Sequence, residues 1–158
     1  MPTEGKVSYY NGSESPVEHY FPFLSIAAPY LEIVEEMTAN EFFQFHLAFK
    51  PLMPDLSILK ILERVGLQDA AEKQIRYYSS GMKQRIKLAQ AFFSDTPVVL
   101  LDEPTTNLDL SGIALYHELI SEYCSERLVI VSSNDALEYS FCKSVIDMKT
   151  LKVNVANV

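Results

Sequence analysis

The fold is constrained most by an alternation of short apolar runs and helical stretches in the second half of the chain. Residues 98–101 form an uninterrupted apolar run, typical of a strand that is covered on both faces, and residues 128–131 form a second one. Between them, residues 110–123 carry apolar side chains at helical spacing. Strands that alternate with helices predict an α/β fold with a parallel sheet.

Strands are also expected near both ends of the chain. Residues 21–28 are apolar up to Pro29 and predict a buried strand. Residues 6–10 alternate weakly before Asn11-Gly12, which is a turn signal. Residues 145–148 and 151–155 predict a closing hairpin.

Two helices are predicted between the first strand and residue 78. Thr38 and Glu41 fit a capping box, in which each side chain bonds the backbone of the other residue. Asp55 is expected to cap the second helix, and Gly66 to end it. One face of the first helix is expected to carry Phe42, Phe45, His46 and Phe49.

Composition narrows the class of protein. The 158 residues include 48% hydrophobic and 22% charged residues, which is ordinary for a globular domain. The net charge of −8 argues against a nucleic-acid surface, which needs a basic patch. No apolar run approaches the roughly 20 residues needed to span a bilayer, so any membrane association is expected to pass through a partner.

Polar clusters follow both strands of the second half. Asp102 and Glu103 come directly after the first strand, and Ser133 and Asn134 follow the second. Ligands of parallel sheets bind beyond the carboxyl ends of the strands, so these clusters predict a site. Asp102 is suited to hold Mg²⁺ and Glu103 to activate a water. For the Asp-Glu pair alone, the start of a solvated loop is the stronger interpretation.

A longer motif surrounds the pair. Residues 100–109 read Leu-Leu-Asp-Glu-Pro-Thr-Thr-Asn-Leu-Asp. This segment closely resembles the Walker B and D-loop segment of ABC ATPases. The resemblance implies that Asp102 is the magnesium residue and Glu103 the general base. It also implies that Asp109 contacts the other protomer of a nucleotide-sandwich dimer.

A second segment, residues 78–85, reads Tyr-Ser-Ser-Gly-Met-Lys-Gln-Arg. Small residues that open a helix expose backbone N–H groups to an anion, and an ordinary serine cap explains the segment equally well when it is taken alone. Its place before the Walker B match resembles the ABC signature motif. The resemblance implies that Ser79, Ser80 and Gly81 act in trans on ATP held by the other protomer.

Asn134 occupies the position where the family has a switch histidine. An asparagine can donate to a phosphate but cannot carry a proton, and an Asn-Asp helix cap is an equally good interpretation. No segment matches the P-loop pattern G-x-x-x-x-G-K-[ST], and no glutamine occurs in residues 25–32, where the family has its Q-loop. Residues 4–12 resemble the strand after the P-loop helix, so we expect an N-terminally truncated ABC ATPase domain.

The resemblance implies an α/β, P-loop NTPase-like fold that lacks its first strand, loop and helix. One partial domain is expected over residues 1–158, with a helical subdomain at about 38–77. Residues 78–158 would then carry the signature, Walker B, D-loop and switch regions.

The function implied is that of the ATP-binding and ATP-hydrolysing subunit of an ABC transporter, with ATP and Mg²⁺ as cofactors. Its expected partners are a transmembrane permease subunit and a second ABC ATPase, identical or different, and its expected place is the cytoplasmic face of the cell membrane. One alternative is a non-hydrolysing module that lends its signature face to a complete ATPase. A soluble ABC ATPase without a membrane partner is a third, ranked last.

Overall fold

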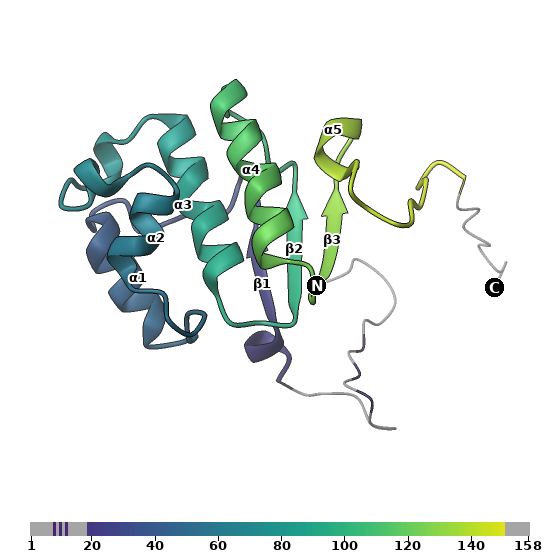
Figure 1. Cartoon of the computed structure of the whole chain (residues 1–158), viewed down its shortest axis with the longest axis horizontal. Helices are drawn as coiled ribbons and strands as arrows, with labels where there is room; N and C mark the ends of the chain where they lie inside the picture. The colour runs from purple at the N-terminus through teal and green to yellow at the C-terminus, as the bar shows by residue number, and fades with distance from the viewer. Residues whose placement is uncertain (1–7, 9, 11, 13–18, 151–158) are drawn as a thin grey trace, which may run out of the picture.

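The computed structural model describes residues 19–150, together with Ser8, Tyr10 and Gly12. Three parallel strands form its sheet in the order β1-β2-β3 (Figure 1). Their bounds are Leu24–Ala27 for β1, Val98–Asp102 for β2 and Leu128–Ser132 for β3. The predicted α/β fold with a parallel sheet is therefore confirmed.

The strand register brings the two polar clusters to the same edge of the sheet. Leu101 lies opposite Val131 and Asp102 lies opposite Ser132. The residues that follow β2 and β3 therefore leave the sheet side by side, at the carboxyl ends of the strands, where parallel sheets place their ligands.

Helices cover one face of the sheet and one side of the molecule. Figure 1 shows α3 and α4 in front of the strands, α1 and α2 beside α3, and α5 beyond the end of β3. Their bounds are Ala39–Leu47 for α1, Ile58–Arg64 for α2, Ser80–Phe93 for α3, Leu110–Tyr123 for α4 and Ala136–Tyr139 for α5, with 3-10 turns at Phe21–Phe23, Gln68–Ala70 and Ile75–Tyr77. The hydrophobic core lies around α3, which contributes Ile86, Leu88, Phe92 and Phe93.

The prediction that both faces of each strand are covered is wrong for β3 within the described residues. Leu128 and Ile130 are 58% and 51% exposed, and Ile26 of β1 is also exposed. These three side chains share one face because alternate residues of a strand point the same way and the strands are in register. Among residues 19–150, α3 and α4 cover the opposite face (Figure 1).

The start of α1 forms as predicted, but its buried face differs. Thr38 Oγ1 accepts from the Glu41 amide at 3.2 Å, and Glu41 Oε2 accepts from the Thr38 amide at 2.9 Å. Phe42 and Phe43 are buried, whereas Phe45 is exposed. The helix therefore packs with the Phe43 side of its surface against the core. It ends at Leu47, so Phe49 lies outside the helix and is 73% exposed.

Three further boundaries correct the sequence-based predictions. Ser57, not Asp55, caps α2: its side chain accepts from the Lys60 amide at 3.3 Å, while Asp55 lies in the preceding turn with a φ of 66°. Only residues 24–27 of the apolar segment 21–28 pair as a strand. Residues 145–148 form no strand and pair with no described strand, and Val145, Ile146 and Met148 are exposed.

The predictions at the extreme ends stay untested. The strand at residues 6–10 and the second strand of the closing hairpin, residues 151–155, lie largely or wholly outside the described residues.

The prediction that Gly66 ends α2 is confirmed: Gly66 adopts a φ of 70° directly after the C-cap of α2, as a glycine that ends a helix does.

His46 joins α1 to the C-terminal part of α3. Its Nε2 lies 2.9 Å from Ser94 Oγ, and its Nδ1 lies 3.1 Å from Gln90 Nε2. The amide of Gln90 donates to Nδ1, which leaves the proton of the neutral ring on Nε2, facing Ser94. Burial, and secondarily the charge of Lys50, lowers the pKa of His46 below its ordinary value.

We expect the free energy of unfolding to fall as the pH is lowered from 7 to 5.5. In the unfolded chain His46 takes up a proton near pH 6.5, whereas in the folded protein its pKa is lower. The stability that the neutral His46 contributes is therefore present above pH 6.5 and is lost as the pH falls. Urea denaturation across this range measures the slope. The His46→Gln variant should show a shallower slope, and an unchanged slope would contradict the assignment.

Candidate functional site

The turn that follows β2 carries the two acidic residues of the predicted site. Asp102 is the last residue of β2 and is partly exposed. Glu103 is exposed and has a φ of 39°, a left-handed conformation that costs about 1–2 kcal/mol for a residue other than glycine. Its amide donates to the Ser132 carbonyl at 2.9 Å, which ties the turn to the end of β3.

Side chains from two helices hold the next two residues of this turn. Gln84 of α3 is buried, and its Nε2 donates to the Pro104 carbonyl at 2.8 Å. The amide and hydroxyl of Thr105 donate to Glu138 Oε1 of α5, at 2.7 Å and 2.5 Å. The turn is therefore fixed from the α3 side and from the α5 side.

A hollow of about 510 Å³ opens beside the turn. It brings together Glu103, the expected general base, and Asn134, which occupies the expected switch position. Asn134 is exposed, and its side chain bonds no described residue. The neighbouring Asp135 caps α5, since its carboxylate accepts from the Leu137 amide at 2.9 Å. The lining residues are Glu103, Thr105, Thr106, Ser133, Asn134, Asp135, Ala136 and Glu138.

The predicted signature residues form the N-terminus of α3. Ser79 is the N-cap, and its Oγ accepts from the Met82 amide at 3.2 Å. Ser79 and Ser80 are exposed, so the first amides of α3 lie at the surface. The positive end of a helix dipole with such free amides favours an anion.

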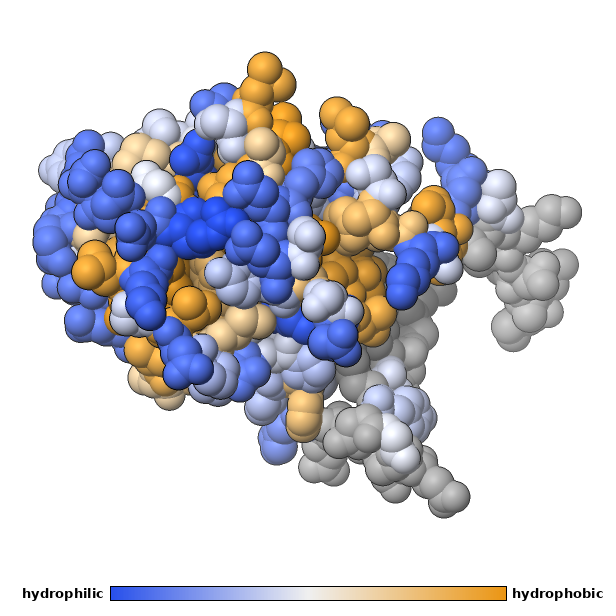
Figure 2. Space-filling view, in the orientation of Figure 1, coloured by the Kyte–Doolittle hydropathy of each residue, from blue (hydrophilic) through white to orange (hydrophobic). Residues whose placement is uncertain are grey.

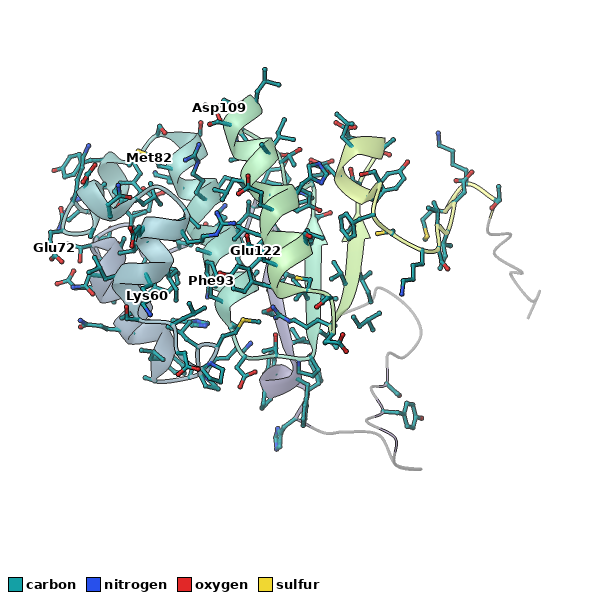
Figure 3. The ribbon with its side chains drawn as sticks, in the orientation of Figure 1. Lys60, Glu72, Met82, Phe93, Asp109 and Glu122 are labelled. Carbon is teal, nitrogen blue, oxygen red and sulfur yellow. The ribbon has the colours of Figure 1, made fainter. Side chains whose placement is uncertain are left out.

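A second hollow, of about 410 Å³, places these residues beside Asp109. Figure 3 shows Met82 and Asp109 at the same end of the molecule, toward which the strands point in Figure 1. The lining residues are Gly66, Leu67, Ser79, Ser80, Gly81, Met82, Arg85, Asn107, Leu108 and Asp109.

Gly81 allows this close approach. A Cβ atom built on Gly81 would lie 3.0 Å from the Asn107 carbonyl oxygen, a backbone atom that cannot move freely. Asn107 itself has a φ of 66°, so the loop is sharply bent where it meets α3. A larger residue at position 81 would separate α3 from the loop that leads to Asp109.

Arg85 and Asp109 link the start of α3 to the start of α4. Arg85 forms an ion pair with Asp109 at 3.5 Å and donates to Ser111 Oγ at 3.1 Å. Asp109 Oδ1 caps α4 by accepting from the Gly112 amide at 2.8 Å. The Ser111 hydroxyl also donates to Asp109 Oδ1, at 2.8 Å. The hydrogen bonds from Gly112 and then from Ser111 lower the pKa of the Asp109 carboxyl.

Comparison with known proteins decides the family. The family model described as "ABC transporter" matches residues 2–106, which are 105 of the 158 residues. The chain belongs to the ABC transporter family. The match includes Ser79, Ser80, Gly81, Asp102 and Glu103 of this ABC chain and ends before Asp109 and Asn134.

Curated ABC proteins align with most of this ABC chain. The uncharacterized ABC transporter ATP-binding protein YybJ of Bacillus subtilis (strain 168) is 28% identical over 94% of the chain and 69% of that protein. The ABC transporter ATP-binding protein NatA of the same strain is 30% identical over 72% of the chain and 48% of NatA. The cytochrome c biogenesis ATP-binding export protein CcmA of Rhodopseudomonas palustris (strain HaA2) is 31% identical over 84% and 65%. The chain thus spans about half to two thirds of the length of these relatives.

A solved structure supports the ABC fold. It is described as an inward-facing conformation of a metal-chelate type ABC transporter, and it superposes with a TM-score of 0.56 at 18% identity. The superposition covers 74% of this chain and 51% of that chain. Within residues 19–150, none of the helices is both long and apolar enough to cross a membrane.

Three residues of this ABC chain were missed by sequence reasoning as parts of the site. Gln84 and Arg85 stand at the end of the 78–85 segment and were not predicted to be site residues, although their spacing of about one helical turn from Gly81 could have placed them facing the loop. Glu138 reaches Thr105 across 33 residues of sequence, and no local pattern indicates that contact.

Proposed function

We propose that this chain is the ATP-binding and ATP-hydrolysing part of an ABC transporter. The observation that carries the proposal is the pairing of its two hollows: Glu103 and Asn134 line one, and Ser79, Ser80 and Gly81 line the other with Asp109. Membership of the ABC transporter family, whose relatives named above are ATP-binding proteins, supports the same function.

In this proposal, Asp102 helps to hold Mg²⁺ and Glu103 accepts the proton of the attacking water. The residues fit that ion: Mg²⁺ is usually bound by one or two carboxylates together with waters and substrate phosphates, and Asp102 is a partly exposed carboxylate at a strand end. When bound, the ion neutralises charge that develops on the phosphate oxygens. Asn134 donates its amide to a phosphate oxygen, since its side chain is not occupied by a described residue.

The signature residues are proposed to act on ATP held by a second ABC ATPase subunit, identical or different. Ser79 and Ser80 are exposed, so the free amides at the start of α3 can face a nucleotide held by that subunit. Leu110, next to Asp109, is 86% exposed. Figure 2 shows a hydrophobic group at the tip of α4, where such a subunit would sit.

We place the helical subdomain at about residues 38–77 and the signature, Walker B, D-loop and switch regions at 78–158. The grouping of α1, α2 and the turns Gln68–Ala70 and Ile75–Tyr77 on one side of α3 supports this division (Figure 1). Transport is proposed to pass through a separate transmembrane permease subunit, which would hold the chain at the cytoplasmic face of the membrane.

Release of phosphate from MgATP tests the function. The full-length protein, purified with its membrane partner, should release phosphate from MgATP. Removal of Mg²⁺ with a chelator should stop the release, because the negative charge on the phosphates then lacks the cation that neutralises it. If the assembled protein releases no phosphate at saturating MgATP, the proposed function is wrong.

A further inference from the structure

Glu138 is a buried acid for which the function proposed above has no role. It is 3% exposed and belongs to α5, the short helix that follows Asn134. Its Oε1 accepts two hydrogen bonds from Thr105, at 2.7 Å from the amide and 2.5 Å from the hydroxyl. Hydrogen bonds to an ionised acceptor are shorter and roughly twice as strong as those between neutral groups.

The backbone around Glu138 is itself held in place. The hydroxyl of Tyr116, a buried residue of α4, donates to the Glu138 carbonyl at 2.7 Å, and the Glu138 amide donates to the Asp135 carbonyl at 3.1 Å. Glu138 is therefore anchored to the core, and its carboxylate is a fixed point for the residues that it contacts.

The residue bonded to this fixed point, Thr105, follows Glu103 by two positions. The left-handed backbone of Glu103 is costly, and such conformations persist only where neighbouring contacts over-determine them. Three contacts do so here: the Ser132 carbonyl holds the Glu103 amide, Gln84 holds the Pro104 carbonyl, and Glu138 holds Thr105. Glu138 is the only one of the three that supplies a charged acceptor.

We propose that Glu138 is a positioning residue that fixes the Glu103 carboxylate at the edge of the larger hollow and keeps it in register with Asn134. Glu138 accepts a hydrogen bond from Thr105, and it belongs to α5, the helix that begins two residues after Asn134. Glu138 therefore ties the turn after β2 to the segment that carries Asn134. The inference rests on the proposed role of Glu103 in hydrolysis.

The test compares variants of the full-length protein, assembled as above, in ATP hydrolysis. Glu138→Ala should lower kcat about 10- to 100-fold with KM for ATP nearly unchanged, because misplacing a reacting group by about 1 Å can cost about 100-fold. Glu138→Gln keeps an acceptor oxygen for Thr105 and should restore kcat to within a few-fold of wild type. Glu126→Ala, at an exposed glutamate, is the matched control and should leave kcat unchanged.

A second pair of variants removes the hydrogen bond from the other side. Thr105→Val loses only the hydroxyl donor and should lower kcat several-fold, whereas Thr105→Ser keeps that donor and should not. If Glu138→Ala does not fold, the comparison of kcat between Thr105→Val and Thr105→Ser tests the proposal. Amide hydrogen exchange supplies an independent readout: in Glu138→Ala, exchange at Thr105 should become faster while exchange in β2 and β3 stays the same.

The two proposals fail differently. A wild-type protein that hydrolyses ATP beside Glu138→Ala and Thr105→Val variants of equal kcat would overturn the positioning role alone. A rise in KM with unchanged kcat, or unchanged exchange at Thr105, would overturn it as well. A wild-type protein that does not hydrolyse ATP would overturn the proposed function and, with it, the role of Glu138.

Discussion

Replacing Glu103 with glutamine is expected to lower the rate of ATP hydrolysis by about 10²- to 10⁴-fold, the usual contribution of a general base. The amide of glutamine cannot accept the proton of an attacking water, but it has nearly the shape of the carboxylate. The hydrogen bond from the residue-103 amide to the Ser132 carbonyl does not involve the side chain and should persist. Phosphate release from MgATP measures the effect.

Nucleotide binding should survive this substitution. Glu103 is exposed, and its side chain bonds no described residue, so its change to glutamine should leave the folded state intact. Calorimetric titration with MgATP should therefore give an affinity close to that of wild type. A Glu126→Gln variant controls for loss of one exposed negative charge. Hydrolysis that stays within threefold of wild type would show that another group takes the proton.

Replacing Arg127 with methionine is expected to lower the free energy of unfolding by about 1–3 kcal/mol, because carbonyl groups inside the protein lose a charged hydrogen-bond donor. Arg127 lies directly before β3, and its guanidinium reaches the carbonyls where α3 ends. Burial lowers the pKa of Arg127, and the many acceptors around it compensate its removal from water. The acceptors are the carbonyls of Ala91, Phe92, Ser94 and Thr96 and the hydroxyls of Ser25 and Thr96.

The loss of stability in Arg127→Met follows from the carbonyl groups that methionine leaves without a hydrogen-bond donor. Its side chain has a similar length but no donor, so the last carbonyls of α3 lose their partner inside the protein. Urea denaturation measures the loss. Arg76→Met is the matched control, because Arg76 is exposed and its side chain contacts just two neighbours among the described residues, the Gln74 side chain and the Tyr77 ring. A loss below about 1 kcal/mol for Arg127→Met would contradict this account.

The sequence predicts well those features that neighbouring residues determine. The apolar runs locate β2 and β3, and the helical spacing locates α4 over Leu110–Tyr123. The capping box of Thr38 and Glu41 forms because both partners lie within one helical turn. In each of these cases, the physical signal is short in sequence.

Features that depend on distant residues were not predictable. The choice of Phe43 over Phe45 for the core depends on where α1 meets its neighbours, and the periodicity fits more than one face. The bonds of Arg127 to the end of α3 cross more than 30 residues of sequence. The exposure of Leu128 and Ile130 depends on which face of the sheet is covered, which an apolar run does not specify.

The candidate site shows the same division. That Glu103 and Asn134 share an edge of the sheet follows from the rule for parallel strands, and the structure places both on one hollow. The positive φ of Glu103 and the contact from Glu138 do not follow from that rule, because they depend on how α5 packs. The need for glycine at position 81 likewise comes from the Asn107 carbonyl.

The N-terminus of α3 is proposed to contact ATP held by a second subunit. Amide hydrogen exchange at Ser80, Gly81 and Met82, measured in the assembled full-length protein with and without MgATP, reports on this contact. We predict that MgATP slows exchange at these amides and leaves it unchanged when the second subunit is absent. Exchange that is the same with and without MgATP in the assembled protein would contradict the claim.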